Sequence, residues 1–137
     1  MSYLVDTNVI SEVRKDSRCN AAVAAWWSRT PAEEIFVSVL TIGEVRNGIE
    51  RVRRRDFRAA AALEKWLVRV VRNQEGRILD VDLEIAQEWG RLNAPNPLPA
   101  VDGLLAATAK VHGMTLVTRN ISHIAQTGVD SLNPWQT

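Results

Sequence analysis

The chain has 137 residues, of which 46% are hydrophobic and 24% are charged, and its formal net charge is +1. This composition excludes a disordered chain, and the length predicts a single domain over residues 1–137. A net charge near zero excludes a uniformly basic nucleic-acid binder. One cysteine and two histidines exclude an internal disulfide and a zinc cluster.

The predicted elements begin with a strand over residues 3–5, which leads through Asp6 into an amphipathic helix. No basic region precedes an apolar run here, and no apolar run approaches the roughly 20 residues of a membrane span, so we expect a cytoplasmic protein without membrane contact. Asn20 can cap a second helix that ends near Thr30, and a second strand follows over residues 35–38.

Two long helices are predicted next, and together they form a protruding helical hairpin. Apolar positions recur at helical spacing from Val39 to about Arg54, and Asp56 can cap a second helix that runs to about Val71. The later elements alternate in the same way: a strand at 78–79, a helix capped by Asp82, a proline-containing loop over 93–100, a helix over 101–111, a strand over 114–118 and a short strand over 131–133. This alternation predicts an α/β fold with a central, mostly parallel sheet of short strands flanked by helices.

Polar side chains follow several of these strands, where binding sites form in parallel α/β sheets. Asp6 follows the first strand, Glu44 lies in the helix after the second strand, and residues 118–120 follow the strand over 114–118. Asp102 lies in the first turn of its helix. Each residue alone is better explained as a helix cap or an exposed carboxylate than as part of a site. Together, they are expected to converge on one edge of the sheet.

Three converging carboxylates would repel one another without a cation. Carboxylate and water oxygens are the ligands that Mg²⁺ and Mn²⁺ prefer, and these ions can promote attack of water on a phosphodiester. Such a reaction needs no His, Cys or Ser nucleophile.

Four sequence segments, in this order, carry a resemblance to a known family: Leu4-Val5-Asp6-Thr7-Asn8, Ser38-Val39-Leu40-Thr41-Ile42-Gly43-Glu44-Val45, Asp102, and Leu116-Val117-Thr118-Arg119-Asn120. They resemble the PIN-domain ribonucleases, and within that family they are most similar to the bacterial VapC toxins of the FitB-like group. The resemblance extends over the whole chain and implies a PIN-like fold.

The resemblance implies a Mg²⁺- or Mn²⁺-dependent endoribonuclease. It assigns Asp6, Glu44 and Asp102 as catalytic residues and metal ligands, and Asn120 as the fourth catalytic position. Thr7 and Thr118 match hydroxyl residues that support the carboxylates or the substrate.

The resemblance also implies partners. Members of this family are toxins of type II toxin–antitoxin pairs, and a VapB-like antitoxin inhibits them by covering the active site. The resemblance further implies a homodimer, which assembles with the antitoxin into a larger hetero-oligomer. This hetero-oligomer reaches operator DNA only through the antitoxin.

One position departs from the family pattern. Many relatives carry Asp three residues after Asn120, whereas this chain has His123. The site therefore has one negative charge fewer, and we expect a single well-occupied metal site in the free protein. We expect His123 to face solvent, with a phosphate contact as the alternative.

The positive charge is concentrated in the predicted hairpin. Residues 46–77 contain ten basic and four acidic residues, a net charge of +6, while the rest of the chain contains seven basic and twelve acidic residues, a net charge of −5. Such a segment is either a solvated helix face or a contact surface for RNA phosphates or for an acidic part of the antitoxin. The candidate contact residues are Arg46, Arg53, Arg54, Arg55 and Arg119.

Two rival functions remain at this point. A noncatalytic module could bind nucleic acid or a partner through the basic hairpin over 46–77, and it would not depend on a metal ion. A phosphoaspartyl site at Asp6 would need a second acid nearby and a lysine after a late strand, where this chain has Asn8 and Arg119.

The five tryptophans are Trp26, Trp27, Trp66, Trp89 and Trp135. They occur mostly at helical positions and are expected in the core or in interfaces, with base stacking as the alternative.

Overall fold

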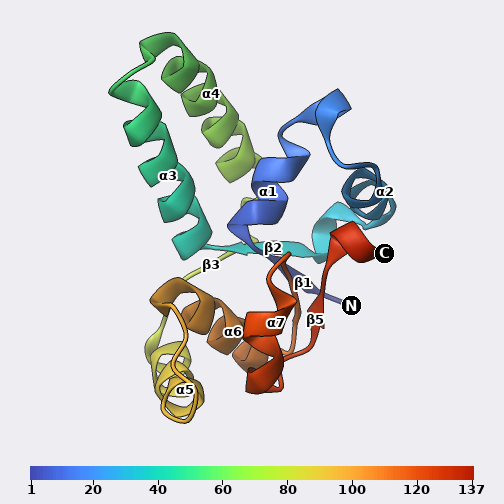
Figure 1. Cartoon of the computed structure of the whole chain (residues 1–137), viewed down its shortest axis with the longest axis vertical. Helices are drawn as coiled ribbons and strands as arrows, with labels where there is room; N and C mark the ends of the chain where they lie inside the picture. Colours follow the sequence, from blue (N-terminus) through green and yellow to red (C-terminus); the bar gives the residue numbers. More distant parts are fainter.

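A five-stranded sheet forms the centre of the computed structural model, which describes residues 1–137 (Figure 1). Its strand order is β3-β2-β1-β4-β5, and every neighbouring pair is parallel. The predicted α/β fold with a parallel sheet is therefore confirmed. The strands are β1 (Tyr3–Val5), β2 (Ile35–Ser38), β3 (Ile78–Leu79), β4 (Thr115–Val117) and β5 (Ser131–Leu132).

Helices cover both faces of this sheet and also extend away from it. In Figure 1, α3 and α4 project as a hairpin from one side, α1 and α2 lie beside them, and α5 and α6 lie on the opposite side of the sheet. The α-helices are α1 (Thr7–Val13), α2 (Ala21–Arg29), α3 (Val39–Arg53), α4 (Phe57–Asn73), α5 (Leu83–Asn93), α6 (Ala100–His112) and α7 (Ile121–Ile124). Short 3-10 helices are η1 (Asp16–Arg18), η2 (Ala32–Glu34), η3 (Ala125–Thr127) and η4 (Pro134–Gln136). None of these helices combines the length and apolarity required to cross a membrane.

The two faces of the central strands pack into different hydrophobic cores. Leu4 packs with Leu105 and Leu116 in a core under α6, whereas its neighbour Val5 packs with Val9 and other residues in a core under α1 and α2. Successive side chains of a strand point to opposite faces, and helices cover both faces here. The sheet is therefore buried on both sides, and only its edges are free to carry polar groups.

The predicted helix starts agree with the observed caps. The side chains of Asp6, Asn20, Asp56 and Asp82 each accept a backbone hydrogen bond at the first turn of α1, α2, α4 and α5 respectively. Gly113 ends α6 with φ of 65°, a left-handed conformation that glycine adopts without strain. The helix α7 was not predicted, because its four residues are too few to show a helical period.

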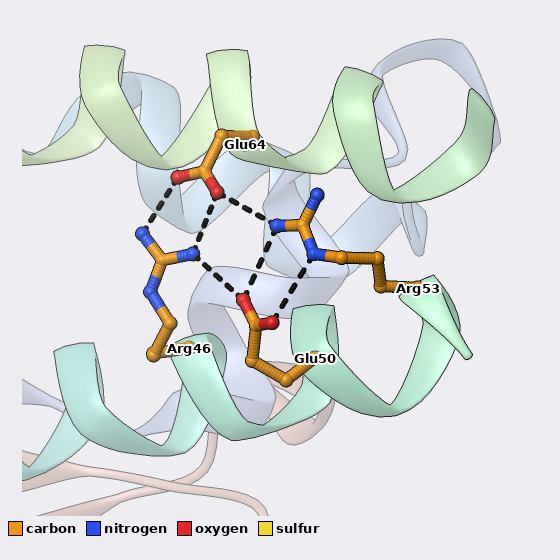
Figure 2. Close-up of polar contacts among 4 residues, drawn as sticks. All are labelled: Arg46, Glu50, Arg53 and Glu64. Carbon is orange, nitrogen blue, oxygen red and sulfur yellow. Dashed lines mark hydrogen bonds and ion pairs between the residues drawn. The ribbon is translucent and has the colours of Figure 1, made fainter. Parts of the chain in front are cut away.

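An ion-pair network joins the two helices of the hairpin (Figure 2). Arg46 of α3 binds Glu64 of α4 at 2.6 Å and Glu50 at 3.2 Å, and Arg53 binds Glu50 at 3.1 Å and Glu64 at 2.9 Å. Each carboxylate thus contacts two guanidinium groups. A separate apolar core between the same two helices contains Val45, Ile49, Ala60 and Leu67.

The network predicts that the hairpin is sensitive to acid. Hydrogen bonding to Arg46 and then the charges of both arginines lower the pKa of Glu64 from 4.5 to about 2. A carboxylate with a lowered pKa in the folded state stabilises the fold above pH 4.5, and this contribution is lost as the pH falls toward 2.

We therefore expect Glu64→Gln to lower the melting temperature by a few degrees at pH 7, and by less in high salt, because the pairs are partly exposed and screened. Thermal melts followed by circular dichroism measure this. Glu33→Gln, an exposed acid without an ion pair, is the matched control. An equal loss for both variants would contradict a stabilising network.

Candidate functional site

The candidate site lies where β1 and β4 end. All strands are parallel, so the residues that follow them meet at one edge of the sheet. Asp6 directly follows β1, and Thr118 directly follows β4, which pairs with β1 in register from Tyr3 to Val5. The backbone amide of Asp6 donates to Val117 at 2.9 Å, which continues the ladder into the site.

Asp6 is the buried centre of the site, with 8% of its surface exposed. One of its oxygens accepts the backbone amide of Thr7 at 2.7 Å, and the other accepts the hydroxyl of Thr118 at 2.8 Å. Burial raises the pKa of Asp6, these hydrogen bonds oppose the rise, and the charges of Glu44 and Asp102 add to it. The carboxylate is thus placed where its ionised form is costly unless positive charge is nearby.

Glu44 approaches the site from α3 through Thr7. The Thr7 hydroxyl, in the first turn of α1, donates a short hydrogen bond to the Glu44 carboxylate. Glu44 itself is exposed, although the sequence places it in an otherwise apolar turn of the helix. Thr7 thus contacts Asp6 through its backbone amide and Glu44 through its hydroxyl.

Asp102 enters from the first turn of α6, with 25% of its side chain exposed. Asp102 and Glu44 are both near enough to Asp6 for their charges to contribute to its raised pKa. The Nδ1 atom of His123 lies 3.9 Å from Asp102, and the His123 side chain is 58% exposed, as expected for a solvent-facing residue.

Thr118 connects the site to the loop after β4. Besides donating to Asp6, its hydroxyl oxygen accepts the backbone amide of Asn120 at 3.2 Å and the side-chain amide of Asn8 at 3.4 Å. Asn120 is exposed at the mouth of the site, with its side chain free. The side-chain amide of Asn8 also donates to Asp6 at 3.4 Å. This contact was not predicted, although Asn8 directly follows the predicted supporting residue Thr7.

The donor set of this site fits a hydrated divalent cation. Asp6 and Glu44 form no ion pair with any basic side chain. The basic side chain nearest to Asp102 is that of His123, with its Nδ1 atom 3.9 Å away. No group of three or more His, Cys, Asp or Glu side chains is arranged to hold a metal ion by itself. Mg²⁺ is commonly bound by one or two carboxylates and keeps several water ligands, because it releases its water reluctantly.

The basic candidates do not form one surface. Arg46 and Arg53 are engaged in the ion pairs of the hairpin, whereas Arg54 and Arg55 are exposed at its turn and form no ion pair. Arg119 is exposed on the loop after β4, and its guanidinium lies 4.9 Å from the ring centre of Trp135.

A groove of about 890 Å³ runs between α1 and α4. Its lining is mainly apolar, with Trp27 and Trp66 among its residues, and Arg14 lies 5.7 Å over the Trp66 ring. Arg55 and Arg69 also line it. Asp16 and Asp56 line it as well, so the groove combines an apolar floor with three arginines and two aspartates.

Comparisons with known proteins agree on one family. Residues 3–128 match the family described as the PIN domain. The chain is 32% identical over 142 residues to the VapC ribonuclease Y4jK of Sinorhizobium fredii, and the alignment covers 97% of each chain. It is 30% identical over 137 residues to toxin FitB of Neisseria gonorrhoeae, which covers 96% of this chain and 97% of FitB.

A solved structure agrees at the level of the fold. The structure of FitAB bound to an IR36 DNA fragment contains a chain that superposes with a TM-score of 0.87 at 30% identity. The match covers 97% of this chain and 95% of that one.

The raised pKa of Asp6 predicts a stability effect of its charge. We expect Asp6→Asn to raise the melting temperature by a few degrees in chelator, because the buried charge and its repulsion by Glu44 and Asp102 are removed. Added Mg²⁺ or Mn²⁺ should stabilise the parent protein and not the variant.

Differential scanning fluorimetry measures both effects. Asp130→Asn, at an exposed acid remote from these contacts, is the control. A variant that melts below the parent in chelator would show that the Asp6 charge stabilises the fold.

Proposed function

The chain belongs to the PIN domain family, and on that basis we propose that it is a metal-dependent endoribonuclease that acts as the toxin of a type II toxin–antitoxin pair. The observation that supports this most strongly is the buried Asp6, with Glu44 and Asp102 close enough to raise its pKa. Three carboxylates at one sheet edge suit a divalent cation and a phosphodiester substrate. The related ribonuclease Y4jK and toxin FitB support the same activity.

The proposed roles follow from what each side chain contacts. Asp6, Glu44 and Asp102 would hold Mg²⁺ or Mn²⁺, whose charge would offset that of the phosphate and lower the pKa of water. Thr118 and the Thr7 amide fix the two oxygens of Asp6, and the Thr7 hydroxyl orients Glu44. Asn120, free at the mouth of the site, would orient water or a phosphate oxygen.

We further propose that a VapB-like antitoxin inhibits the chain by binding the groove between α1 and α4. The groove offers an apolar floor together with Arg14, Arg55 and Arg69, which suits an amphipathic segment with acidic residues. The related FitAB is bound to an IR36 DNA fragment, which supports a complex of this chain with an antitoxin that also binds DNA. We propose that the antitoxin carries the DNA contact and that the hetero-oligomer is built on a toxin homodimer.

The first prediction concerns the reaction. The purified chain should cleave RNA with Mg²⁺ or Mn²⁺ and not with chelator, and Asp102→Asn should lower the cleavage rate by about 100-fold or more, because a carboxylate of the ion site is lost. Gel analysis of single-stranded RNA measures this, with Asp130→Asn as the control. Nucleic-acid binding that persists in chelator without any cleavage would instead identify a noncatalytic binding module.

The second prediction concerns the antitoxin. Arg55→Glu should weaken the complex with the purified antitoxin by about tenfold, because it places a negative charge at the rim of the groove. RNA cleavage by the free chain should not change. Arg58→Glu, an exposed residue of α4 that does not line the groove, is the matched control in isothermal titration calorimetry. Equal losses for both variants would contradict docking in this groove.

A further inference from the structure

Arg119 and Trp135 form a contact that the carboxylate site does not use. The Arg119 guanidinium lies 4.9 Å from the ring centre of Trp135, a distance typical of a cation–π interaction. Trp135 is held in place because its ring packs against the hydrophobic core under α1 and α2. The ring therefore offers a fixed aromatic face to the guanidinium.

The backbone of Arg119 is also held on both sides. Its amide donates to the side chain of Asn8 at 3.4 Å, and its carbonyl accepts the side-chain amide of Asn133 at 3.5 Å. Asn133 in turn accepts the backbone amide of Trp135 at 2.9 Å and caps η4. Residues from the ends of β1, β4 and β5 thus converge on one arginine.

This arginine has no internal anion. Arg119 is exposed and forms no ion pair, and the acid that faces it, Glu12, is bonded to Lys15 at 3.0 Å and to the backbone amide of Asn20 at 2.9 Å. An arginine that is positioned by three neighbours, Trp135, Asn8 and Asn133, and that forms no ion pair is suited to an external anion.

The place of Arg119 indicates which anion this is. In the strand order β3-β2-β1-β4-β5, Asp6 follows β1 and Thr118-Arg119 follows the adjacent strand β4, so the two backbones lie one strand spacing, about 5 Å, apart at the same edge. The Arg119 side chain lies over the Trp135 ring. A single divalent ion offsets two of the three carboxylate charges, so a positive side chain beside them favours the approach of an RNA phosphate. The groove proposed above for the antitoxin is lined by other residues and does not include Arg119.

Building on the function proposed above, we propose that Arg119 binds a phosphate of the substrate RNA beside the carboxylates, and that Trp135 is a positioning residue that holds the guanidinium for this contact. The C-terminal turn η4 then belongs to the substrate site, although it lies after the last strand of the sheet.

The experiment measures RNA binding and cleavage separately. A short fluorescein-labelled single-stranded RNA of mixed sequence is titrated in chelator at several salt concentrations, and kcat and KM are measured with Mg²⁺. Arg119→Gln should weaken binding by about tenfold and flatten the slope of log K against log salt by about 0.7, the value for one single-strand phosphate. It should raise KM and leave kcat within about twofold.

Trp135 is tested through a double-mutant cycle. Trp135→Leu should weaken RNA binding by about two- to fivefold in the parent, and it should have no effect in the Arg119→Gln background. Trp135→Phe, which keeps an aromatic face, should restore most of the affinity. Arg18→Gln, which removes an exposed and unpaired positive charge beyond the far end of α1, should bind RNA as the parent does.

Three results would overturn the inference. An equal effect of Trp135→Leu in both backgrounds would mean that the ring stacks on a base or supports only the fold. An unchanged salt slope for Arg119→Gln would exclude the phosphate contact, and a weaker antitoxin complex in that case would assign the arginine to the protein partner. After either of these variant results, cleavage by the parent would still support the ribonuclease function. A parent chain that neither binds nor cleaves RNA would contradict both the role of Arg119 and the proposed ribonuclease function.

Discussion

The cost of keeping the Asp6 carboxylate buried at the end of the central strand is the constraint on which the rest of the site depends. Its two oxygens are already occupied by Thr7 and Thr118, yet burial and the neighbouring carboxylates still raise its pKa. A cation bound beside Asp6, as proposed above, would offset this cost. The double-sided burial of β1 fixes Asp6 in this position, because the strand cannot shift without exposing a core on one face.

Positive charge is used differently in the two parts of the molecule. In the hairpin, Arg46 and Arg53 neutralise Glu50 and Glu64, and Arg77 donates to the carbonyl oxygens of Ile35 and Asn73. These arginines hold the chain's own elements together. The two arginines and two glutamates of the network cancel, so the net charge of +6 over residues 46–77 lies outside the network. The exposed basic residues of this segment that form no ion pair are Arg51, Arg54, Arg55, Arg58, Lys65, Arg69 and Arg72.

The sequence was sufficient for the fold and for the carboxylates because both depend on local patterns. Alternation of strands and helices predicts a parallel sheet, and that sheet brings Asp6 and Thr118 to one edge whatever the details of the loops. The catalytic roles of these residues stay predictions. The hairpin was predicted as a shape, but its arginines could not be divided into paired and free ones, since the pairing depends on how α3 faces α4. The contact between Arg119 and Trp135 was missed for the same reason.

The order of the strands has a consequence for synthesis of the protein. Asp6 and Thr118 are 112 residues apart in the chain, and β1 forms the centre of the sheet although it is made first. Contacts of such long sequence separation form late in folding, because a large loop must close before they are made. A nascent chain can build the hairpin from α3 and α4 before β4 is available to pair with β1 and enclose Asp6. The environment of Asp6 is thus complete only after β4 has been made, later than the hairpin.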